Sequence, residues 1–454
     1  MIYYDLTDLV NHSQYSNRVS GIQRVVLEIA KVLSKRDDVK FFMLNPAIDK
    51  WCTVDGIDFD STEDLFQFKV LWEYSWIDTG PSKWPEFFRK YKIPAAHGFK
   101  KNRYRFTKTA LHVPLLNNIL YKVENNHLKK VVNRKSIKIE NMPKIDKNDS
   151  IIICGGIWCF QDQYENFLEK NKDSNLIFYL HDIIPLVVPA LVPVYLNNMF
   201  VPYVKSLYKY AKVIVTSAKN NLVDYENYIK QTYGYKKQIL KAIGLPYGFD
   251  FSYEKEMISS FRPEAKELLH QKYCLCVGSI EPRKNHSGLL NTWYKYINSE
   301  KYQGEILVIA GGWGCEIDFV RNSLYGTGLF NGTVRVIERP SDCELAFLYD
   351  NCTFTVYPSH YEGWGLPIGE SLSFCKPVIH FANSSLEEVS RGLGDVVTPG
   401  DYQGLFNAID KLFHDKEYRL QKVKLISDNL NKLPTWENYG KVFYETIKET
   451  VSKS

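Results

Sequence analysis

The chain has 454 residues, a formal net charge of +5, 45% hydrophobic residues and 24% charged residues. These are values of a globular protein, and the length exceeds the roughly 100 to 200 residues of one domain, so we expect two large domains. No stretch approaches the roughly 18 uncharged apolar residues of a membrane span, and the N-terminus lacks the basic start and apolar run of a signal peptide. The sequence therefore predicts a soluble protein that stays in the cytoplasm.

The cysteines and histidines show no pattern of metal ligands. Nine cysteines are scattered without a CxxC pair, and the ten histidines form no cluster of ligand spacing beside them. We expect reduced thiols, no structural zinc and no metal in the active site. Cys274 and Cys276 alternate within "KYCLCVG", which a buried strand explains better than redox chemistry.

The excess of positive over negative charge comes from residues 89–138, which we call the basic region. It holds fourteen Lys and Arg residues and one acid, which leaves 43 basic and 51 acidic residues in the rest of the chain. Such a patch needs an anionic partner, and aromatic rings among the cations suit an element at an anionic membrane surface. Nucleic acid fits the charge equally well, and a solvated insertion without a partner is a third interpretation. The interleaved aromatic residues are Trp84, Phe87, Phe88, Tyr91, Phe99, Tyr104 and Phe106.

Short apolar runs alternate with helical patterns through the first half of the chain. Behind Gly21, apolar residues recur at helical spacing from Ile22 to Val32, which predicts a turn that leads into a helix. Strands are expected at 39–44, 150–156, 175–185 and 212–218, and a helix at 192–211. This alternation indicates a parallel sheet covered on both faces, which the basic region interrupts as an insertion.

The same alternation restarts in the second half. Strands are expected at 273–278, 305–312, 333–338, 354–359 and 377–382, with helices at 286–297 and 343–351 between them. The chain is therefore predicted to have an α/β fold of two doubly wound, Rossmann-like domains that face each other across a cleft. Ligands of such sheets usually bind outside the carboxyl ends of the strands.

The segment "FTVYPSHYEGWGLPIGESLSFCKPV" predicts a strand, a glycine loop and a helix in that order. Gly363 and Gly365 allow a ligand to approach the backbone closely, and the helix start favours a phosphate. If the helix starts near Pro367, Glu370 lies in its first turn, where its carboxylate can accept two hydroxyl donors such as those of a ribose. The alternative is that Glu370 only caps the helix.

Two further polar groups follow predicted strands. Arg283 and Lys284 stand directly after the strand at 273–278, where two cations can clamp a diphosphate, although solvated loop cations are about as common. His181 and Asp182 end the strand at 175–185, so the imidazole is expected to face the cleft. A histidine in this position is more often structural.

The motifs "GSIEPRKN", "SDCELAFLYDNC", "YPSHYEGWGLPIGES", "KPVI" and "SSLEEV" resemble family 4 of the retaining, nucleotide-sugar-dependent glycosyltransferases, which have the GT-B fold. The hallmark of this family, two glutamates separated by seven residues, is matched by Glu362 and Glu370. The N-terminal half resembles the family more loosely, through "SGIQRVVLEIAKVL", "LHDIIP", "VIVTSAKNN" and "LPYGFD". Two positions depart from the usual pattern, Trp364 in place of Phe or Tyr and Gly369 in place of an apolar residue.

The resemblance implies a role for each matching residue. Glu370 would bind the ribose hydroxyls and Glu362 would lie near the donor sugar. Arg283 and Lys284 would neutralise the diphosphate, and His181 would contact the transferred sugar. The remaining donor-site residues would be Gly21 in the N-terminal turn, Gly363, Trp364, Gly365 and Leu366 through their amides, and Arg339 near the base.

The expected domains follow the same resemblance. Residues 1–246 would bind the acceptor and carry the basic insertion at about 80–140, and residues 247–434 would bind the nucleotide sugar. Residues 435–454 are expected to form a C-terminal helix that packs back on the N-terminal domain.

The sequence thus predicts a metal-independent, retaining hexosyltransferase of the EC 2.4 class, peripheral to the inner face of the plasma membrane. It would move a hexose or deoxyhexose from GDP-mannose or a UDP-hexose to a lipid-linked or oligosaccharide acceptor, in the synthesis of capsule, O-antigen or another bacterial surface polysaccharide. One alternative is a non-catalytic GT-B subunit that scaffolds an assembly complex. A nucleic-acid binder rests on the basic region alone and leaves the C-terminal motifs unexplained, so we expect no nucleic acid.

Overall fold

The computed structural model describes residues 1–452 except 17–18, 20, 46–49, 60–64, 78–117, 120, 124, 127–128, 131–136 and 248–251. Most of the basic region, and with it the predicted membrane contact and the interleaved aromatic residues, lies outside the described residues. Among the described helices, none has both the length and the apolar run needed to cross a membrane.

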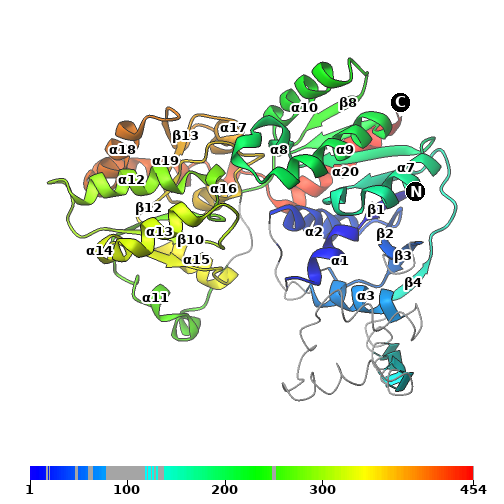
Figure 1. Ribbon diagram of the computed structural model, residues 1–454, viewed down its shortest axis with the longest axis horizontal. Coiled ribbons are helices and arrows are strands. Elements are labelled where there is room, and N and C mark those ends of the chain that lie inside the picture. The colour runs from blue at the N-terminus through cyan, green and yellow to red at the C-terminus, as the bar shows by residue number, and fades with distance from the viewer. Residues whose placement is uncertain are drawn as a thin grey trace. The chain divides into compact units, whose positions relative to one another are not determined.

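The first sheet has eight strands in the order β4-β3-β2-β1-β5-β6-β7-β8 (Figure 1). The four strands predicted for this half are present as β2, β5, β6 and β7, and β1 pairs in parallel with both β2 and β5. The antiparallel strands β3 and β4 at one edge were not predicted. The bounds are β1 Ile2–Asp5, β2 Val39–Asn45, β3 Lys50–Asp55, β4 Lys138–Asn141, β5 Ser150–Ile153, β6 Asn175–Leu180, β7 Val213–Thr216 and β8 Ile239–Ala242.

Helices of this half include the two that the sequence predicted. α2 begins at Gly21 and buries Val25, Val26 and Ile29, while α9 spans the predicted helix at 192–211. The bounds are α1 Thr7–Ser13, α2 Gly21–Leu33, α3 Phe66–Ile77, α7 Gln161–Lys170, α8 Ile184–Val187, α9 Val194–Tyr210 and α10 Lys219–Thr232.

The second sheet has six strands in the order β11-β10-β9-β12-β13-β14, and every recorded pair in it is parallel. Five of its strands were predicted, and the three-residue edge strand β14 was not. The bounds are β9 Tyr273–Val277, β10 Ile306–Ala310, β11 Val334–Ile337, β12 Phe354–Tyr357, β13 Val378–Phe381 and β14 Asp395–Val397.

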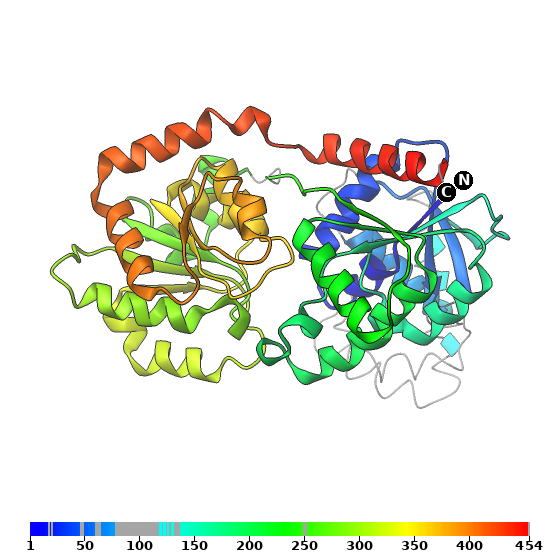
Figure 2. The same cartoon turned by 90° about the horizontal axis from the view of Figure 1, so that it is seen from above.

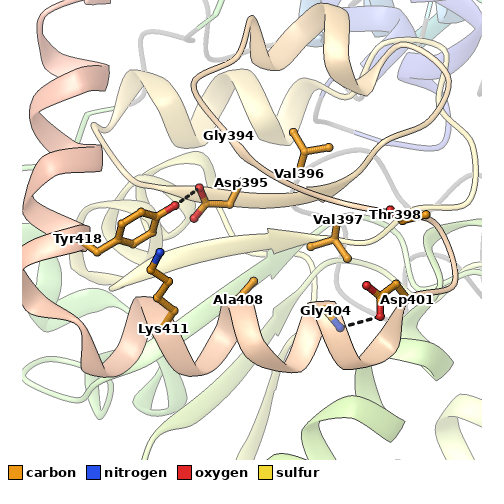
Figure 3. A pocket seen from close by; sticks show the side chains of 10 residues that line it. All are labelled: Gly394, Asp395, Val396, Val397, Thr398, Asp401, Gly404, Ala408, Lys411 and Tyr418. Carbon is orange, nitrogen blue, oxygen red and sulfur yellow. Dashed lines mark hydrogen bonds between the residues drawn. The ribbon is translucent and has the colours of Figure 1, made fainter.

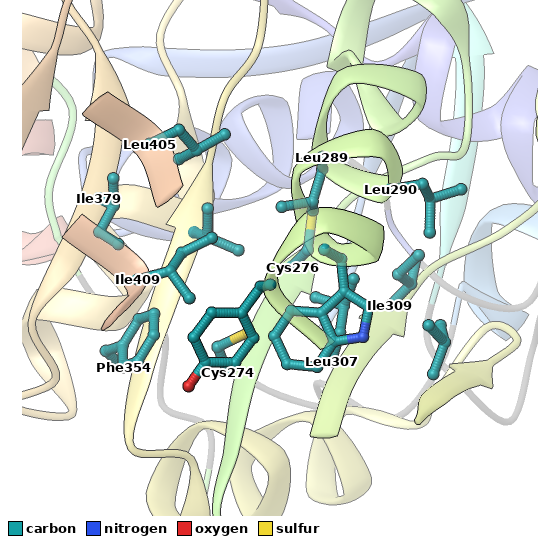
Figure 4. Packing of buried hydrophobic residues seen from close by; sticks show 14 of the residues in the cluster. Cys274, Cys276, Leu289, Leu290, Leu307, Ile309, Phe354, Ile379, Leu405 and Ile409 are labelled. Atoms are coloured by element: carbon teal, nitrogen blue, oxygen red, sulfur yellow. The ribbon is translucent and has the colours of Figure 1, made fainter. Parts of the chain in front are cut away.

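Apolar side chains cover both faces of this second sheet. Cys274 and Cys276 pack into one buried cluster with Leu289 of α12 and Leu405 of α18 (Figure 4). The intervening Leu275 points to a second cluster, which holds residues of α15. The alternation makes the sheet doubly wound, and the two thiols serve as small buried side chains, as predicted. None of the nine cysteines, all of which lie in the described part of the chain, forms a disulfide.

The helices around the second sheet reach the end of the chain. α12 has the predicted bounds, and α15 begins one residue earlier than predicted. The bounds are α11 Pro263–Lys266, α12 His286–Ile297, α13 Asp318–Gly326, α14 Gly328–Gly332, α15 Asp342–Asn351, α16 Leu366–Ser373, α17 Leu386–Ser390, α18 Tyr402–His414, α19 Lys416–Ser427 and α20 Trp436–Ser452.

The chain divides into two compact units. The first comprises Met1–Tyr179, Lys209–Ile214 and Tyr444–Ser454, and the second comprises Leu180–Tyr208 and Val215–Phe443, so the predicted boundary at residues 246 and 247 falls inside the second. The last helix, α20, is red in Figure 2, and its Tyr444 and Lys448 both contact Asp38 of the first unit at 2.8–3.0 Å.

Candidate active site

Arg283 and Lys284 lie in a tight turn between β9 and α12. The turn ends at Asn285, whose backbone is left-handed (φ 59°). The side-chain carbonyl of Asn285 caps α12 by accepting a hydrogen bond from the Gly288 amide at 3.2 Å. The side-chain amide of Asn285 donates to the carbonyl of Pro358, just past β12, at 3.0 Å. The two cations are therefore anchored to the carboxyl ends of two neighbouring strands.

Glu362 is bound by both cations. Its two carboxylate oxygens lie 2.7 Å from Nη1 of Arg283 and 2.7 Å from Nζ of Lys284, and the hydroxyl of Tyr357 donates to it at 2.9 Å. Burial raises the pKa of the Glu362 carboxyl, but Arg283 and Lys284 outweigh burial and lower the pKa to about 2. Three of the predicted site residues thus form one charged cluster. A diphosphate that bound Arg283 and Lys284 would share these two cations with Glu362.

The glycine loop between Glu362 and α16 is held from two sides. Ser384 accepts a hydrogen bond from the Glu362 amide at 3.0 Å, and Ser385 donates to the carbonyls of Glu362 and Trp364 at 2.9 Å each. These serines belong to the motif "SSLEEV", whose residues were not assigned a role in the sequence analysis. Gly365 has a φ of +102° and takes the N-cap position of α16, a conformation that favours glycine.

Glu370 lies in the second turn of α16, and the prediction of the first turn was wrong. The helix begins at Leu366, one residue before Pro367, because the left-handed Gly365 lets the chain turn into the helix at once. Glu370 is the fifth helical residue and is 7% exposed. The hydroxyl of Tyr349 on α15 donates to its Oε2 at 2.6 Å, and the Tyr349 ring stacks on Phe374 at 5.4 Å.

The two departures from the family pattern pack against one segment. A Cβ at position 369 would lie 2.6 Å from a ring carbon and 3.3 Å from Cα of Tyr247, so glycine leaves the room that Tyr247 occupies. Trp364 in turn packs on Gly244, where a Cβ would lie 3.1 Å from its ring. Both unusual residues therefore contact the segment of residues 244–247.

If Glu370 binds the ribose hydroxyls of a nucleotide, as the family resemblance implies, removal of the hydroxyl of Tyr349 should weaken that contact. We expect Tyr349→Phe to raise the Kd for the nucleoside diphosphate about tenfold, because a hydrogen bond to a charged group contributes roughly 1.5–3 kcal/mol. The ratio between the Kd values of the deoxyribose and ribose nucleotides should also shrink. Tyr273→Phe is the control, since its buried hydroxyl donates at 2.7 Å to the Leu348 carbonyl and not to Glu370. Equal effects of both substitutions would contradict the assignment.

His181 follows β6 and meets the glycine loop. A Cβ at Gly363 would lie 2.7 Å from Oδ2 of Asp182 and 3.0 Å from the His181 carbonyl oxygen, so the two segments touch. Asn221 of α10 donates from one side-chain nitrogen to the carbonyls of both His181 and Gly363 at 2.8 Å. The sequence did not single out Asn221, because an asparagine near a helix start is usually an exposed or capping residue.

The other two predicted residues belong to other elements of the fold. Arg339 follows β11 with a φ of 45°, is exposed, and its Nε would lie 3.3 Å from a Cβ at Gly312 after β10. Gly21 is the first residue of α2 in the first unit. Within the described part of the chain, no group of three or more His, Cys, Asp or Glu side chains could hold a metal ion, and metal independence stays a prediction.

Comparison with known proteins finds a family match in the second half of the chain. Residues 258–424, which contain Arg283, Lys284, Glu362 and Glu370, match the family "Glycosyl transferases group 1". The match covers little more than a third of the chain, and we call this region the group 1 domain. The family name describes sugar transferases, which is the class of enzyme that the sequence predicted.

Two curated relatives have names that refer to surface polysaccharides. O-antigen chain mannosyltransferase B of Escherichia coli is 36% identical over 153 residues, which cover 34% of this chain and 40% of that protein. The capsular polysaccharide biosynthesis glycosyltransferase CapM of Staphylococcus aureus is 26% identical over 227 residues, which cover 48% of this chain and 58% of that protein. The chain thus spans roughly two fifths to three fifths of these relatives.

A solved structure covers the whole chain. HepE of Anabaena, crystallised with UDP and glucose, aligns over 99% of both chains with a TM-score of 0.59 and 15% identity. This likeness confirms the predicted GT-B fold with two parallel-sheet domains.

The group 1 domain also contains a pocket of about 410 Å³ beside β14 and α18 (Figure 3). Asp395 in its wall accepts a hydrogen bond from Tyr418 at 2.8 Å and pairs with Lys422 at 2.8 Å, while Nζ of Lys411 lies 3.5 Å from the Tyr418 ring centre. Its ten lining residues include none of the predicted site residues: Gly394, Asp395, Val396, Val397, Thr398, Asp401, Gly404, Ala408, Lys411 and Tyr418.

His286, the first residue of α12, makes the stability of the domain depend on pH. Burial, together with the Lys284 cation, lowers the pKa of His286 from 6.5 to about 4. Below pH 6.5 the unfolded chain therefore takes up a proton that the folded chain does not, and the free energy of unfolding falls by about 2 kcal/mol between pH 7 and pH 5.

Urea unfolding of wild type and His286→Asn at both pH values tests this. The difference between the two proteins should shrink by about 2 kcal/mol at pH 5. The comparison of the two proteins is needed because burial raises the pKa of Asp5 to about 6. This shift raises the free energy of unfolding of both proteins as the pH falls, which is opposite to the effect of His286. A difference that does not change with pH would contradict the assignment.

Proposed function

We propose that the chain is a metal-independent, retaining glycosyltransferase that moves a hexose or deoxyhexose from a nucleoside diphosphate sugar to a glycan acceptor. The observation that carries this proposal is the cluster of Arg283, Lys284 and Glu362 at the carboxyl ends of β9 and β12, with Glu370 buried in the helix that follows. The cluster combines cations for a diphosphate with a carboxylate for hydroxyl groups.

Departure of the diphosphate is the step that this cluster would assist. As the bond between C1 of the sugar and the phosphate oxygen breaks, the sugar becomes oxocarbenium-like and negative charge grows on the leaving group. Arg283, Lys284 and the free amides at the start of α16 would stabilise that charge, and one such donor is typically worth roughly 3–4 kcal/mol. The protein's own cations would thus supply what a metal ion supplies in other transferases.

Retention would follow from attack on the same face. The acceptor hydroxyl would approach C1 from the side of the leaving group, form the new C1–O bond, and pass its proton to the departing phosphate oxygen. Glu362 does not suit the role of base, because a pKa of about 2 makes its carboxylate a weak proton acceptor and its oxygens are bound by the two cations. It would orient the cations and the sugar.

The relatives narrow the donor and the acceptor. The mannosyltransferase name of the E. coli relative favours a mannosyl donor, with GDP-mannose tested first and UDP-hexoses second. The O-antigen and capsule names favour an oligosaccharide acceptor, lipid-linked at the inner face of the membrane, in surface polysaccharide synthesis.

Measurements of nucleotide binding and of donor turnover together test the proposed function. A nucleoside diphosphate that binds the native state should raise the melting temperature, and a panel of bases identifies the donor class. Wild type should release nucleoside diphosphate slowly from that donor without an acceptor, and Glu370→Ala should lose this activity. A scaffold subunit would release none in either form, which would overturn the proposal.

The basic region would hold the protein at the membrane. We expect the protein to sediment with anionic vesicles at low salt and to lose this binding when Lys100, Lys101, Arg103 and Arg105 are replaced by Gln, since each cation near the surface contributes about 1 kcal/mol. Neutralising four exposed lysines of the second compact unit, Lys295, Lys416, Lys424 and Lys432, is the control. Vesicle binding that survives the first set would contradict this part.

A further inference from the structure

Asn221 joins two segments that carry predicted sugar contacts. It is the third residue of α10, is 1% exposed, and its side-chain nitrogen lies 2.8 Å from the His181 carbonyl oxygen and 2.8 Å from the Gly363 carbonyl oxygen. Both partners can only accept, so the amide nitrogen must face them, and its two N–H groups match two acceptors. The hydroxyl of Thr216 lies 3.0 Å from the same nitrogen.

The segment of His181 and Asp182 is in close contact with the glycine loop. A Cβ at Gly363 would approach Oδ2 of Asp182 to 2.7 Å, Cβ of Asp182 to 2.8 Å and the His181 carbonyl oxygen to 3.0 Å. Protein interiors are close-packed, so a change in the separation of the two backbones would move the side chains and amides on both. The positions of His181 and of the glycine loop are therefore coupled through Asn221.

Further hydrogen bonds join the N-terminal half of α10 to Glu388 and to Tyr361. The carboxylate of Glu388 on α17 accepts hydrogen bonds from the amides of Lys219 and Asn220 at 2.9 Å each. The hydroxyl of Tyr361 donates to Asp224 at 2.7 Å. These bonds fix the helix that carries Asn221 against the loop, so the amide is presented in one place.

We propose that Asn221 is a positioning residue that sets the distance between His181 and the glycine loop, and so the geometry of the donor sugar between them. The inference rests on the proposed function. Asn221 makes no recorded contact with Arg283, Lys284 or Glu370, so the nucleoside diphosphate should bind without its help. Its effect is expected in the reaction of the sugar, where a misplacement of about 1 Å can lower the rate by 10²-fold.

The experiment compares Asn221→Asp with Thr216→Val in the full chain. The aspartate has the same shape but places a carboxylate beside two carbonyl oxygens, while the valine removes one buried partner of Asn221 and leaves both of its bonds to the carbonyls. We expect Asn221→Asp to lower kcat for nucleoside diphosphate release by roughly 30- to 100-fold and to change the Kd of the nucleoside diphosphate less than about threefold. Thr216→Val should keep kcat within about threefold of wild type.

Each other outcome is decisive. An unchanged kcat in Asn221→Asp, a fall in kcat matched by Thr216→Val, or a Kd that rises in step with the fall in kcat would each overturn the inference while wild-type turnover upholds the proposed function. No turnover by wild type with any donor would overturn both. If Asn221→Asp does not fold, Asn221→Ala carries the same test, because it removes both N–H donors without adding a charge.

Discussion

Lys284→Ala should lower kcat for sugar transfer by about 10²- to 10³-fold, which is the cost of removing one donor that stabilises charge in a transition state. Nζ of Lys284 lies 2.7 Å from Glu362 and 2.7 Å from the hydroxyl of Tyr357, so it is held in place before any ligand binds. Its loss removes a charge aimed at the diphosphate and leaves Glu362 with Arg283 alone. Steady-state release of nucleoside diphosphate from the donor measures the effect.

Lys422→Ala is a matched control for this substitution. Lys422 pairs with Asp395 at 2.8 Å, and its side chain is 12% exposed, as is that of Lys284. Both variants lose a largely buried ion pair in the same domain, but only one lies in the cluster. We expect Lys422→Ala to retain kcat, and a similar loss of kcat in both variants would show that the effect comes from stability.

Gly363→Ala should abolish most turnover through a steric conflict. The added Cβ would meet Asp182 at 2.7 and 2.8 Å and the His181 carbonyl oxygen at 3.0 Å, and a backbone carbonyl and a Cβ cannot move aside as a side-chain tip can. We expect a loss of about 1–3 kcal/mol in unfolding free energy and a fall in kcat of at least about 10²-fold. Urea unfolding and donor turnover measure the two effects.

Gly326→Ala is the control for the extra methyl group. Gly326 ends α13, and a Cβ there would meet nothing within 4 Å. Because alanine favours the helix, this variant should be as stable as wild type or up to about 1 kcal/mol more stable. Wild-type turnover in Gly363→Ala would contradict the tight contact between the glycine loop and residues 181–182.

Local patterns sufficed to predict the strongly apolar elements. β9 reads as a buried strand because Cys274 and Cys276 alternate with apolar residues, and both faces of its sheet are covered. β3, which lies next to the edge strand β4, escaped prediction because its buried residues alternate with polar ones over only six positions, and the edge strand β14 has only three residues. Short edge strands depend on pairing with a neighbour, which a single sequence does not display.

The sequence indicated which residues come together in the candidate site, but it did not indicate the contacts that they make with one another. The order of strand, turn and helix placed Arg283, Lys284 and Glu362 at one edge of the sheet. Their pairing depends on rotamers in the folded chain, so the sequence did not predict that the two oxygens of Glu362 are bound by Arg283 and Lys284. Asn221 was missed for the same reason, since its burial arises only when α10 meets the glycine loop.

Release of nucleoside diphosphate from GDP-mannose and UDP-hexoses by wild type and Glu370→Ala distinguishes a glycosyltransferase from a scaffold subunit. We predict that wild type releases nucleoside diphosphate from one donor class, faster with an oligosaccharide acceptor and without added metal, and that Glu370→Ala, though folded, loses this release. Turnover that persists in Glu370→Ala, or wild type that releases nothing from any donor, would contradict it.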